Sequence, residues 1–238
     1  TGKRLYAYKP ELKWTAASLT KLMSSLVAVE HRPAWNKVVA LSSKDEVGGG
    51  RLRVTSGSTM TYADMFYSTI VGSANNTATA LARLSGLGSA GFVKAMNVKA
   101  KKLGMANSSF VDASGMDPKN TVTATDLVKL AHAAFNEPMI RRAATTMNYR
   151  FRVRSSGEQK SIVNTNTLLT EDPDVWVTGG KTGFLYESRY NLVVRMKAYP
   201  FETQKPLVTV VVLGSPTKEG SFKTAKALAN WAWRAYEW

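Results

Sequence analysis

A serine and a lysine near the start of the chain have the spacing of a nucleophile and its base. Ser18 and Lys21 lie in the run Ala-Ala-Ser-Leu-Thr-Lys-Leu-Met (residues 16–23), which is predicted to be helical. Residues three positions apart share one face of a helix, so the Lys21 amine would reach the Ser18 hydroxyl. A neutral lysine can take the hydroxyl proton and make the serine nucleophilic. The other interpretation of this pair is a serine cap followed by a surface lysine.

Lys21 can act as a base only when it is neutral, whereas an ordinary lysine, with a pKa of about 10.4, is protonated at pH 7. Burial and a second nearby cation both disfavour the ammonium form. Leu19, Leu22 and Met23 provide apolar surroundings. Lys181 would provide the second cation if the fold brings it close. The hypothesis is therefore a neutral Lys21 that deprotonates Ser18.

Two further motifs follow in order, and each tripeptide occurs once in the chain: Ser73-Ala74-Asn75 and Lys181-Thr182-Gly183. Ser73 could relay a proton, and the Asn75 amide can both donate and accept hydrogen bonds. Taken alone, that motif could equally cap a helix. Lys181 and Thr182 could hold a carboxylate at a strand edge that binds an extended peptide. The other interpretation of this glycine-rich segment is a turn.

Several other motifs are set aside. A second Ser-x-x-Lys begins at Ser215, where Pro216 predicts a turn. A phosphate-binding Walker loop would need a glycine where Val175 stands. His31 and His132 are far apart in the sequence, so they provide no metal motif, and neither lies near a nucleophile elbow of the kind a Ser-His-Asp triad uses.

The composition is that of a basic globular chain. Its 238 residues, 44% of them hydrophobic, suffice for one large domain or two small ones. No apolar run approaches the roughly 20 residues that span a bilayer, and no leader sequence is recognised, so we expect a mature form or a trimmed chain. The lack of cysteine excludes a thiol nucleophile, disulfides and cysteine-bound metal.

The charge balance favours anionic partners. The chain has 32 Lys and Arg against 17 Asp and Glu, a net charge of +15. The charged clusters are short, and none of the usual nucleic-acid-binding motifs is present, so we expect no nucleic-acid partner. Alternate arginines at positions 150, 152 and 154 would line one face of a strand. These charges are either a solvated face or a means of electrostatic association with an anionic bacterial envelope.

Hydrophobic periodicity predicts strands toward both ends of the chain and helices in the middle. Helices are expected over residues 18–30, 62–71, 75–85, 90–103, 125–135 and 219–236. Strands are expected over residues 4–8, 38–41, 149–153, 192–196 and 207–213. Thr61 and Asp64 have the spacing of a capping box. In the last helix, Trp231 is expected to pack against the sheet. Trp233 could instead be exposed and touch a membrane or a partner, but packing in the core is the favoured interpretation.

This order predicts an α/β (α+β) fold in which a mostly antiparallel sheet is built from both chain ends and flanked by helices. An all-helical subdomain, roughly residues 42–145, would be inserted into a sheet subdomain of residues 1–41 and 146–238. Because no internal repeat or evident linker interrupts the chain, residues 1–238 are expected to form a single domain.

In this order the three motifs resemble the active-site set of the penicillin-recognising serine enzymes. Their surroundings resemble those of the low-molecular-mass penicillin-binding proteins, specifically the D-alanyl-D-alanine carboxypeptidase family. The matching segments cover nearly the whole chain: residues 1–6, 17–23, 73–78, 110–116, 123–127 and 180–184. The resemblance implies a β-lactamase/transpeptidase-like fold and a periplasmic or otherwise extracytoplasmic place in the bacterial cell envelope.

The resemblance also implies a mechanism. Ser18 would attack the carbonyl between two D-alanines of a peptidoglycan stem peptide and form an acyl-enzyme, with Lys21 as the base. Ser73 would pass a proton toward the leaving amine, and Asn75 would place Lys21 and the substrate amide. Water would then release the shortened peptide. β-Lactam antibiotics would acylate the same serine as covalent inhibitors.

Substrate binding is implied for the third motif and the residue after it. Lys181 and Thr182 would bind the terminal carboxylate, and Gly183 belongs to the same segment. The backbone N–H groups of Ser18 and Phe184 would form the oxyanion hole. No metal or organic cofactor is implied.

Three features depart from the family pattern. The family normally has a strand before the Thr1-Gly2 turn, whereas this chain starts at the turn, so that strand is expected to be trimmed or supplied differently. The C-terminal β-rich domain of many members is missing. Arg189 stands where the family often has a small residue, and we expect it to be a surface charge.

Three alternatives are weighed against the carboxypeptidase. A class A β-lactamase would need a Glu-x-x-x-Asn, which Glu158 and Glu171 do not provide. A DD-endopeptidase that cuts cross-links would use the same residues. A non-catalytic wall-binding or antibiotic-sensing module could share the scaffold, although the three motifs are intact.

Overall fold

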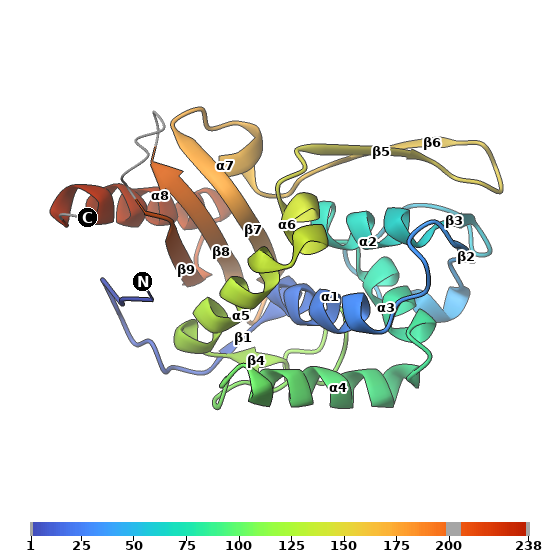
Figure 1. Ribbon diagram of the computed structural model, residues 1–238, viewed down its shortest axis with the longest axis horizontal. Helices are drawn as coiled ribbons and strands as arrows, with labels where there is room; N and C mark the ends of the chain where they lie inside the picture. The colour runs from blue at the N-terminus through green and yellow to red at the C-terminus, as the bar shows by residue number, and fades with distance from the viewer. Residues whose placement is uncertain (1, 199–205, 237–238) are drawn as a thin grey trace.

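The computed structural model describes residues 2–198 and 206–236. Thr1, which belongs to the expected Thr1-Gly2 turn, lies outside the described residues. The largest sheet is antiparallel, with β7 (Val175–Leu185), β8 (Arg189–Ala198) and β9 (Val208–Ser215) in that order. The long helix α8 (Lys218–Ala235) packs on one face of this sheet (Figure 1). Side chains alternate along a strand, so the opposite face of the sheet carries a second set of side chains. This second face packs on helices from the middle of the chain.

The helices of that middle part surround α1 (Thr20–Glu30), which contacts each of them. They are α2 (Tyr62–Val71), α3 (Asn75–Leu84), α4 (Gly88–Lys102), α5 (Ala124–Asn136) and α6 (Pro138–Ala144). The shorter helical segments are η1 (Ala17–Leu19), η2 (Ser43–Asp45) and α7 (Thr167–Thr170), of which η1 and η2 are 3-10 turns. Only the last two residues of α1 escape burial, as expected from its hydrophobic sequence.

Three antiparallel pairs complete the strands of the described residues. They are β1 (Trp14–Thr15) with β4 (Thr121–Val122), β2 (Val38–Ala40) with β3 (Thr59–Thr61), and β5 (Asn148–Arg152) with β6 (Gln159–Val163). The β5–β6 hairpin extends alongside α2 (Figure 1). Its inner face carries Tyr149, whose ring stacks on Tyr67 at 4.3 Å between centroids. Its outer face carries Arg150 and Arg152, both exposed, as the alternation predicts.

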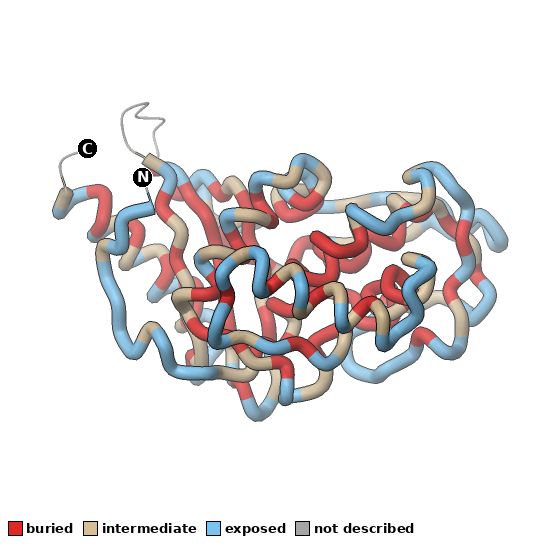
Figure 2. Tube along the Cα trace, turned by 60° about the horizontal axis from the view of Figure 1, so that its bottom comes forward, coloured by how far each residue is buried: buried red, intermediate tan, exposed pale blue. Residues whose placement is uncertain are grey.

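Buried side chains form two clusters. The larger one lies among the helices around α1 and reaches the sheet at Val193. The smaller one lies between the sheet and α8, and contains Leu192, Val194 and Met196 from β8. Figure 2 shows the buried segments running through both parts of the molecule. The alternating residues of β8 therefore contact both clusters, and this strand joins the helical part to the sheet.

The mixed fold with antiparallel sheets is confirmed, but the contribution of the N-terminus to the main sheet is wrong. Residues 4–8 form no strand. They are held to α8 instead, because the Tyr236 hydroxyl donates to the Leu5 carbonyl at 3.1 Å and the Tyr6 ring meets Trp231 edge-on at 6.2 Å. Tyr6 and Tyr8 are exposed, so these alternating side chains are not buried against a sheet, as those of a core strand would be. Within the part of the chain that the structure describes, the main sheet consists of β7, β8 and β9.

The helices agree more closely with the expectation. The α2 helix spans the predicted residues, and its capping box of Thr61 and Asp64 is present. Ser18 precedes α1 in the 3-10 turn η1. Ser215, expected in a turn, is the last residue of β9, and its hydroxyl donates to the Thr217 carbonyl at 2.9 Å.

The core packing favoured for Trp233 is confirmed, whereas the expected packing of Trp231 against the sheet is wrong. Trp233 is 5% exposed, and its indole N–H donates to the Pro206 carbonyl at 3.2 Å. Trp231 is 41% exposed and meets the Tyr236 ring edge-on at 5.6 Å. The helix turns about 100° per residue, so residues two apart face different ways, and only one of these two tryptophans can lie against the sheet. Among the described helices, none combines the length and apolar content that crossing a bilayer requires.

Candidate active site

The first motif forms the amine–hydroxyl contact that its spacing predicts. Lys21 lies in the first turn of α1, and its Nζ is 2.9 Å from Ser18 Oγ. Ala17, immediately before Ser18, has a φ of 49°, an unfavourable left-handed conformation for a residue with a side chain. This strained turn directs the hydroxyl of Ser18 to the amine one helical turn further along.

Lys21 is fully buried and has two further partners. Its Nζ lies 2.6 Å from Asn75 Oδ1 and 2.6 Å from the Ser114 carbonyl. Both partners can only accept hydrogen bonds through these oxygens. A neutral amine has two N–H donors and one lone pair, so donation to the two carbonyl oxygens leaves the lone pair for the Ser18 hydroxyl. With these three oxygen partners, a neutral Lys21 amine is oriented so that it can accept the Ser18 proton.

The surroundings of Lys21 also favour its neutral form. Burial holds the pKa of Lys21 well below its ordinary value, and the charge of Lys181 lowers it further. The Asp112 carboxylate acts in the opposite direction and raises the pKa. The second cation that was expected near Lys21 is thus present, and it is Lys181.

The second and third motifs meet through Ser73 and Lys181. Lys181 Nζ donates to Ser73 Oγ at 2.7 Å and to the Thr182 carbonyl at 2.9 Å. Lys181 is 1% exposed, and burial lowers its pKa to about 7. Ser73 has a φ of 57°, so its conformation is also strained. Ser73, which lies just before α3, and Lys181 of β7 are therefore in contact although they are 108 positions apart in the sequence.

Asn75, the first residue of α3, connects Lys21 to the loop of residues 48–50, which consists of three glycines. Its Nδ2 donates to the Gly48 carbonyl at 2.9 Å, which fixes Oδ1 toward Lys21 Nζ. A Cβ at Gly49 would lie 2.7 Å from Asn75 Nδ2. A glycine is needed there for the loop to approach the amide so closely.

The third motif borders Ser18. A Cβ at Gly183 would lie 3.2 Å from Ser18 N, so the β7 backbone passes directly beside the turn that carries Ser18. Thr182 Oγ1 lies 2.6 Å from Thr165 Oγ1. The Phe184 side chain is 42% exposed, and its ring lies 4.5 Å from that of Tyr190. All eight residues expected at the site thus lie in segments that converge on Ser18, Lys21 and Lys181.

Two groups at the site were missed in the sequence. The Ser114 carbonyl contacts Lys21, and the Asp112 carboxylate organises the loop that carries Ser114. A backbone carbonyl gives no signal in a sequence. The spacing of Asp112, Ser114 and Gly115 could have suggested a tight turn in which an aspartate accepts backbone N–H groups.

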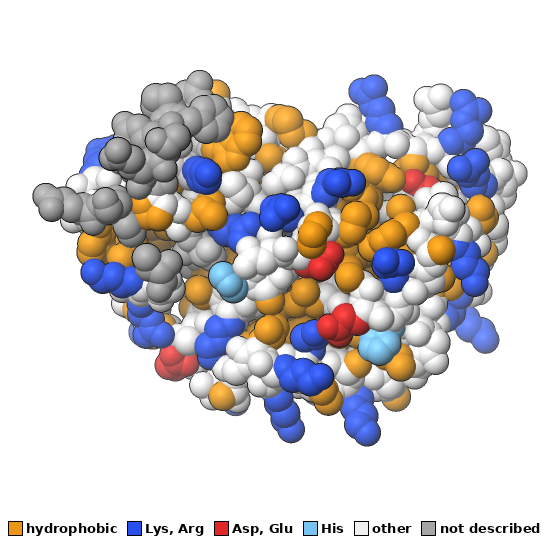
Figure 3. Space-filling view, in the orientation of Figure 1, with side chains coloured by type: hydrophobic (Ala, Val, Ile, Leu, Met, Phe, Trp, Pro, Cys, Tyr) orange, Lys and Arg blue, Asp and Glu red, His pale blue; other side chains and the backbone are white. Residues whose placement is uncertain are grey.

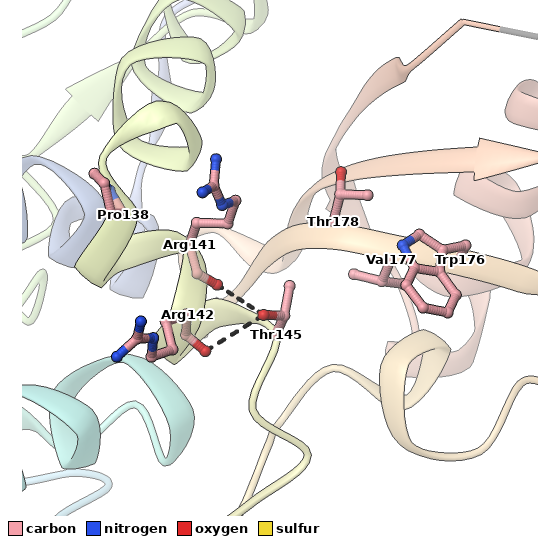
Figure 4. Close-up of a pocket in the computed structure, with 7 residues that line it drawn as sticks. All are labelled: Pro138, Arg141, Arg142, Thr145, Trp176, Val177 and Thr178. Carbon is pink, nitrogen blue, oxygen red and sulfur yellow. Dashed lines mark hydrogen bonds between the residues drawn. The ribbon is translucent and has the colours of Figure 1, made fainter. Parts of the chain in front are cut away.

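Outside this site, a cavity of about 300 Å³ lies between α6 and the start of β7 (Figure 4). Its lining contains none of the eight site residues and includes Arg141, Trp176 and Thr178. Arg189, at the start of β8, is exposed, as expected of a surface charge. Figure 3 shows Lys and Arg side chains spread over the viewed face rather than gathered over one element.

Comparison with known proteins gives one family match. The model of a family described as D-alanyl-D-alanine carboxypeptidase matches residues 1–217. Among curated relatives, a D-alanyl-D-alanine endopeptidase of Pseudomonas aeruginosa is 33% identical over 97% of this chain and 73% of the relative. The corresponding endopeptidase of Escherichia coli is 34% identical with the same coverage. The carboxypeptidase DacF of Bacillus subtilis is 29% identical over 100% of this chain and 60% of the relative.

Solved structures share the fold. The crystal structure of a Streptomyces DD-transpeptidase superimposes with a TM-score of 0.86 at 22% identity, covering 98% of this chain and 93% of that one. A D-alanyl-D-alanine carboxypeptidase of Mycobacterium tuberculosis gives a TM-score of 0.85 at 24% identity, covering 100% and 88%. At these identities the likeness establishes the architecture, and the chemistry has to be argued from the site.

Proposed function

The chain belongs to the D-alanyl-D-alanine carboxypeptidase family of serine hydrolases, and on this premise we propose that it removes the terminal D-alanine from peptidoglycan stem peptides through an acyl-enzyme on Ser18. The observation that carries the proposal is the buried Lys21 amine, 2.9 Å from Ser18 Oγ with two carbonyl oxygens on its remaining sides. A general base must lie within hydrogen-bond reach of the proton it abstracts, and Lys21 meets that condition.

Acylation begins when Lys21 Nζ takes the proton of Ser18 Oγ. The oxygen attacks the carbonyl carbon between the two D-alanines, a C–O bond forms, and the C–N bond breaks. The proton that Lys21 took passes through the hydroxyl of Ser73 to the departing amine, which leaves Lys21 neutral again; the Ser73 hydroxyl lies 2.7 Å from Lys181 Nζ. Asn75 holds Lys21 in place and binds the substrate amide. Water then attacks the ester, releases the shortened peptide and restores Ser18.

The edge of β7 provides the binding groups. Lys181 and Thr182 bind the terminal carboxylate of the peptide, because an ammonium and a hydroxyl together suit a carboxylate. The N–H groups of Ser18 and Phe184 form the oxyanion hole. This assignment is supported by Gly183, the residue before Phe184, because a Cβ added there would lie 3.2 Å from Ser18 N.

The domain organisation follows from the same site. We propose that residues 1–238 act as one catalytic domain, with a helical part at residues 42–145 and a sheet part at residues 1–41 and 146–238. The site supports this, because Ser73 comes from the first part and Lys181 from the second. A family that acts on the cell wall works outside the cytoplasm, and we place this chain in the periplasm or an equivalent compartment. Its net charge of +15 would favour association with an anionic envelope.

Mass spectrometry after incubation with a penicillin tests the proposal. We expect a stable adduct on the tryptic peptide of residues 14–21, which contains Ser18. The Ser18→Ala variant, folded by circular dichroism, should carry no adduct. A folded wild-type protein without an adduct would contradict the proposal and favour a non-catalytic wall-binding module. Rapid penicillin turnover would favour a β-lactamase instead.

A DD-endopeptidase is the second candidate, since relatives named as endopeptidases share 33% and 34% identity with this chain. Both activities break a bond after a D-alanine through the same serine. A pentapeptide and a cross-linked muropeptide dimer, compared at equal concentration, distinguish them. Faster hydrolysis of the pentapeptide supports the carboxypeptidase, and faster hydrolysis of the dimer supports the endopeptidase.

A further inference from the structure

The loop of residues 112–120 lies against the segment that carries the nucleophile. Three of its backbone carbonyls accept hydrogen bonds from that segment: Ala113 from Ser24 Oγ at 2.6 Å, Ser114 from Lys21 Nζ at 2.6 Å, and Asn120 from Ala16 N at 2.8 Å. Gly115 has a φ of +84°, and a Cβ there would lie 2.0 Å from the Ala17 carbonyl oxygen. The loop therefore fits against the strained turn before Ser18 with no room for a side chain at Gly115.

The conformation of this loop depends on one carboxylate. Asp112 accepts five hydrogen bonds, from Ser114 N (2.6 Å), Ser114 Oγ (2.9 Å), Gly115 N (2.5 Å), Asp117 N (2.7 Å) and Asn120 Nδ2 (3.0 Å). Three of these donors are backbone N–H groups, so the side chain fixes the path of the main chain through Ser114 and Gly115. The carbonyl that contacts Lys21 belongs to that fixed stretch.

Asp112 also remains charged. Burial alone would raise the pKa of its carboxyl group, but the hydrogen bonds from Asp117, Gly115 and Ser114 outweigh burial and leave the pKa below its usual value. The groups that face the Lys21 amine are Ser18, Asn75, the Ser114 carbonyl, the Lys181 charge and the Asp112 charge. Of the two charges, Lys181 disfavours the ammonium form of Lys21, and Asp112 favours it.

We propose that Asp112 is a positioning residue for the reaction, which holds the Ser114 carbonyl against Lys21 and whose negative charge maintains the strength of Lys21 as a base. The proposal rests on the assignment of Lys21 as the base that activates Ser18. A base whose pKa falls too far below the working pH is always neutral but accepts a proton weakly. Asp112 offsets part of the effect of burial and of Lys181, so that Lys21 can both be neutral at rest and hold the Ser18 proton during attack.

Asp112→Asn tests both parts of the proposal, and Asp117→Asn is the matched control. Asp117 lies in the same loop and loses the same charge, but its side-chain carboxylate accepts only the Lys119 N–H within the described structure. Titration of Lys21 by NMR on lysine side chains labelled with ¹³C at Cε, assigned with Lys21→Arg, measures the pKa without any reaction. Asp112→Asn should lower the pKa of Lys21 by about 0.5 unit or more, and Asp117→Asn should leave it unchanged.

Acylation by a chromogenic cephalosporin, followed from pH 5 to pH 10, supplies the second readout. Asp112→Asn should slow acylation at the optimum by about tenfold or more and move the acid limb to lower pH. Asp112→Glu keeps the charge but misplaces it by one methylene. It should slow acylation similarly while leaving the acid limb close to that of the wild type.

The outcomes separate the alternatives. An unchanged Lys21 pKa and pH profile in Asp112→Asn, with only a lower melting temperature, would mean a purely structural loop residue and overturn the proposal. If Asp112→Asn does not fold, Asp112→Glu decides, because a wild-type acylation rate there would refute the positioning role. If the wild-type protein does not acylate at all, the proposed function fails, while the NMR titration still shows whether Asp112 controls the charge of Lys21.

Discussion

Two buried lysines lie in the site, and their surroundings differ. Lys21 is enclosed by oxygens from η1, from the start of α3 and from the loop of residues 112–120. Lys181 lies on the edge strand β7 and contacts Ser73 and its own strand. Burial lowers both pKa values, to about 7 for Lys181 and well below the ordinary value for Lys21, which also feels the charge of Lys181. The two lysines are equally buried, but their different surroundings thus give their amines different pKa values and different hydrogen-bond partners.

The difference suggests a division of labour. Lys21 has a lone pair directed at a hydroxyl and a charge that is strongly disfavoured, which suits a base. Lys181 has a pKa of about 7, so a bound carboxylate can readily hold it in the ammonium form. Because Lys181 also depresses the pKa of Lys21, the two roles are coupled, and changes at either lysine should test this comparison.

Replacing Lys21 should have the largest effect. Lys21→Met removes the base but keeps the length and apolar character of the side chain, so acylation by penicillin should fall by about 10³-fold, within the range for general-base catalysis. Stopped-flow acylation measures this effect, with thermal unfolding to confirm the fold. A rate within tenfold of the wild type would mean that another group activates Ser18.

Replacing Lys181 should affect binding more than the chemical step. Lys181→Met removes a charged donor to the terminal carboxylate, so KM for a D-Ala-D-Ala peptide should rise by about 100-fold. A peptide with an amidated C-terminus should show little change, because it has no carboxylate to lose the contact. Equal losses for both peptides would contradict a carboxylate-binding role for Lys181.

The buried charge of Lys181 should also appear in stability. Its pKa is about 7 in the folded chain, and an unfolded lysine titrates near 10.4, so the unfolded state binds more protons between these values. The contribution of Lys181 to stability is therefore greatest above about pH 10.4 and is lost as the pH falls toward about 7. Lys181→Met should flatten this dependence and stabilise the protein at pH 7 by about 2 kcal/mol. Urea unfolding at pH 7 and pH 10 measures both effects, and a destabilised variant at pH 7 would contradict them.

The smallest effect is expected at the hydroxyl pair on the edge of β7. Thr165→Val removes the partner of Thr182 Oγ1, 2.6 Å away, and frees that hydroxyl to rotate. Loss of one neutral hydrogen bond should reduce kcat/KM by about threefold to tenfold. Thr165→Ser keeps the hydroxyl and should retain wild-type kcat/KM. Equal losses in both variants would show that the methyl group, rather than the hydrogen bond, is important.

Local patterns in the sequence predicted the site better than the sheet. The contact of Ser18 with Lys21 depends on residues three apart, and helix geometry fixes such neighbours. The capping box of α2 is equally local. In contrast, the alternation over residues 4–8 is compatible with a strand, but whether a strand forms depends on a partner elsewhere in the chain. The unexpected exposure of Trp231 has the same origin, since the face of α8 that is covered is set by the sheet.

The missing part of the site was also non-local. The sequence motifs named the side chains that converge at the site, including Lys181, which lowers the pKa of Lys21 as expected. They could not reveal the Ser114 carbonyl, because every residue has a carbonyl and only the folded path of the chain selects this one. Asp112 was overlooked for a related reason, since its five hydrogen bonds form only when the loop has folded.

The distances in sequence between the partners of this site have a consequence for folding kinetics. Lys21 meets partners 54 and 93 positions away, and Lys181 meets Ser73 across 108 positions. Closing such long loops costs entropy that local helix formation does not, so long-range contacts of this kind form slowly. During refolding from urea, helical circular dichroism should therefore recover before the ability to bind penicillin. Cutting the chain between α3 and β7 should leave two fragments that are each unable to react until they reassociate.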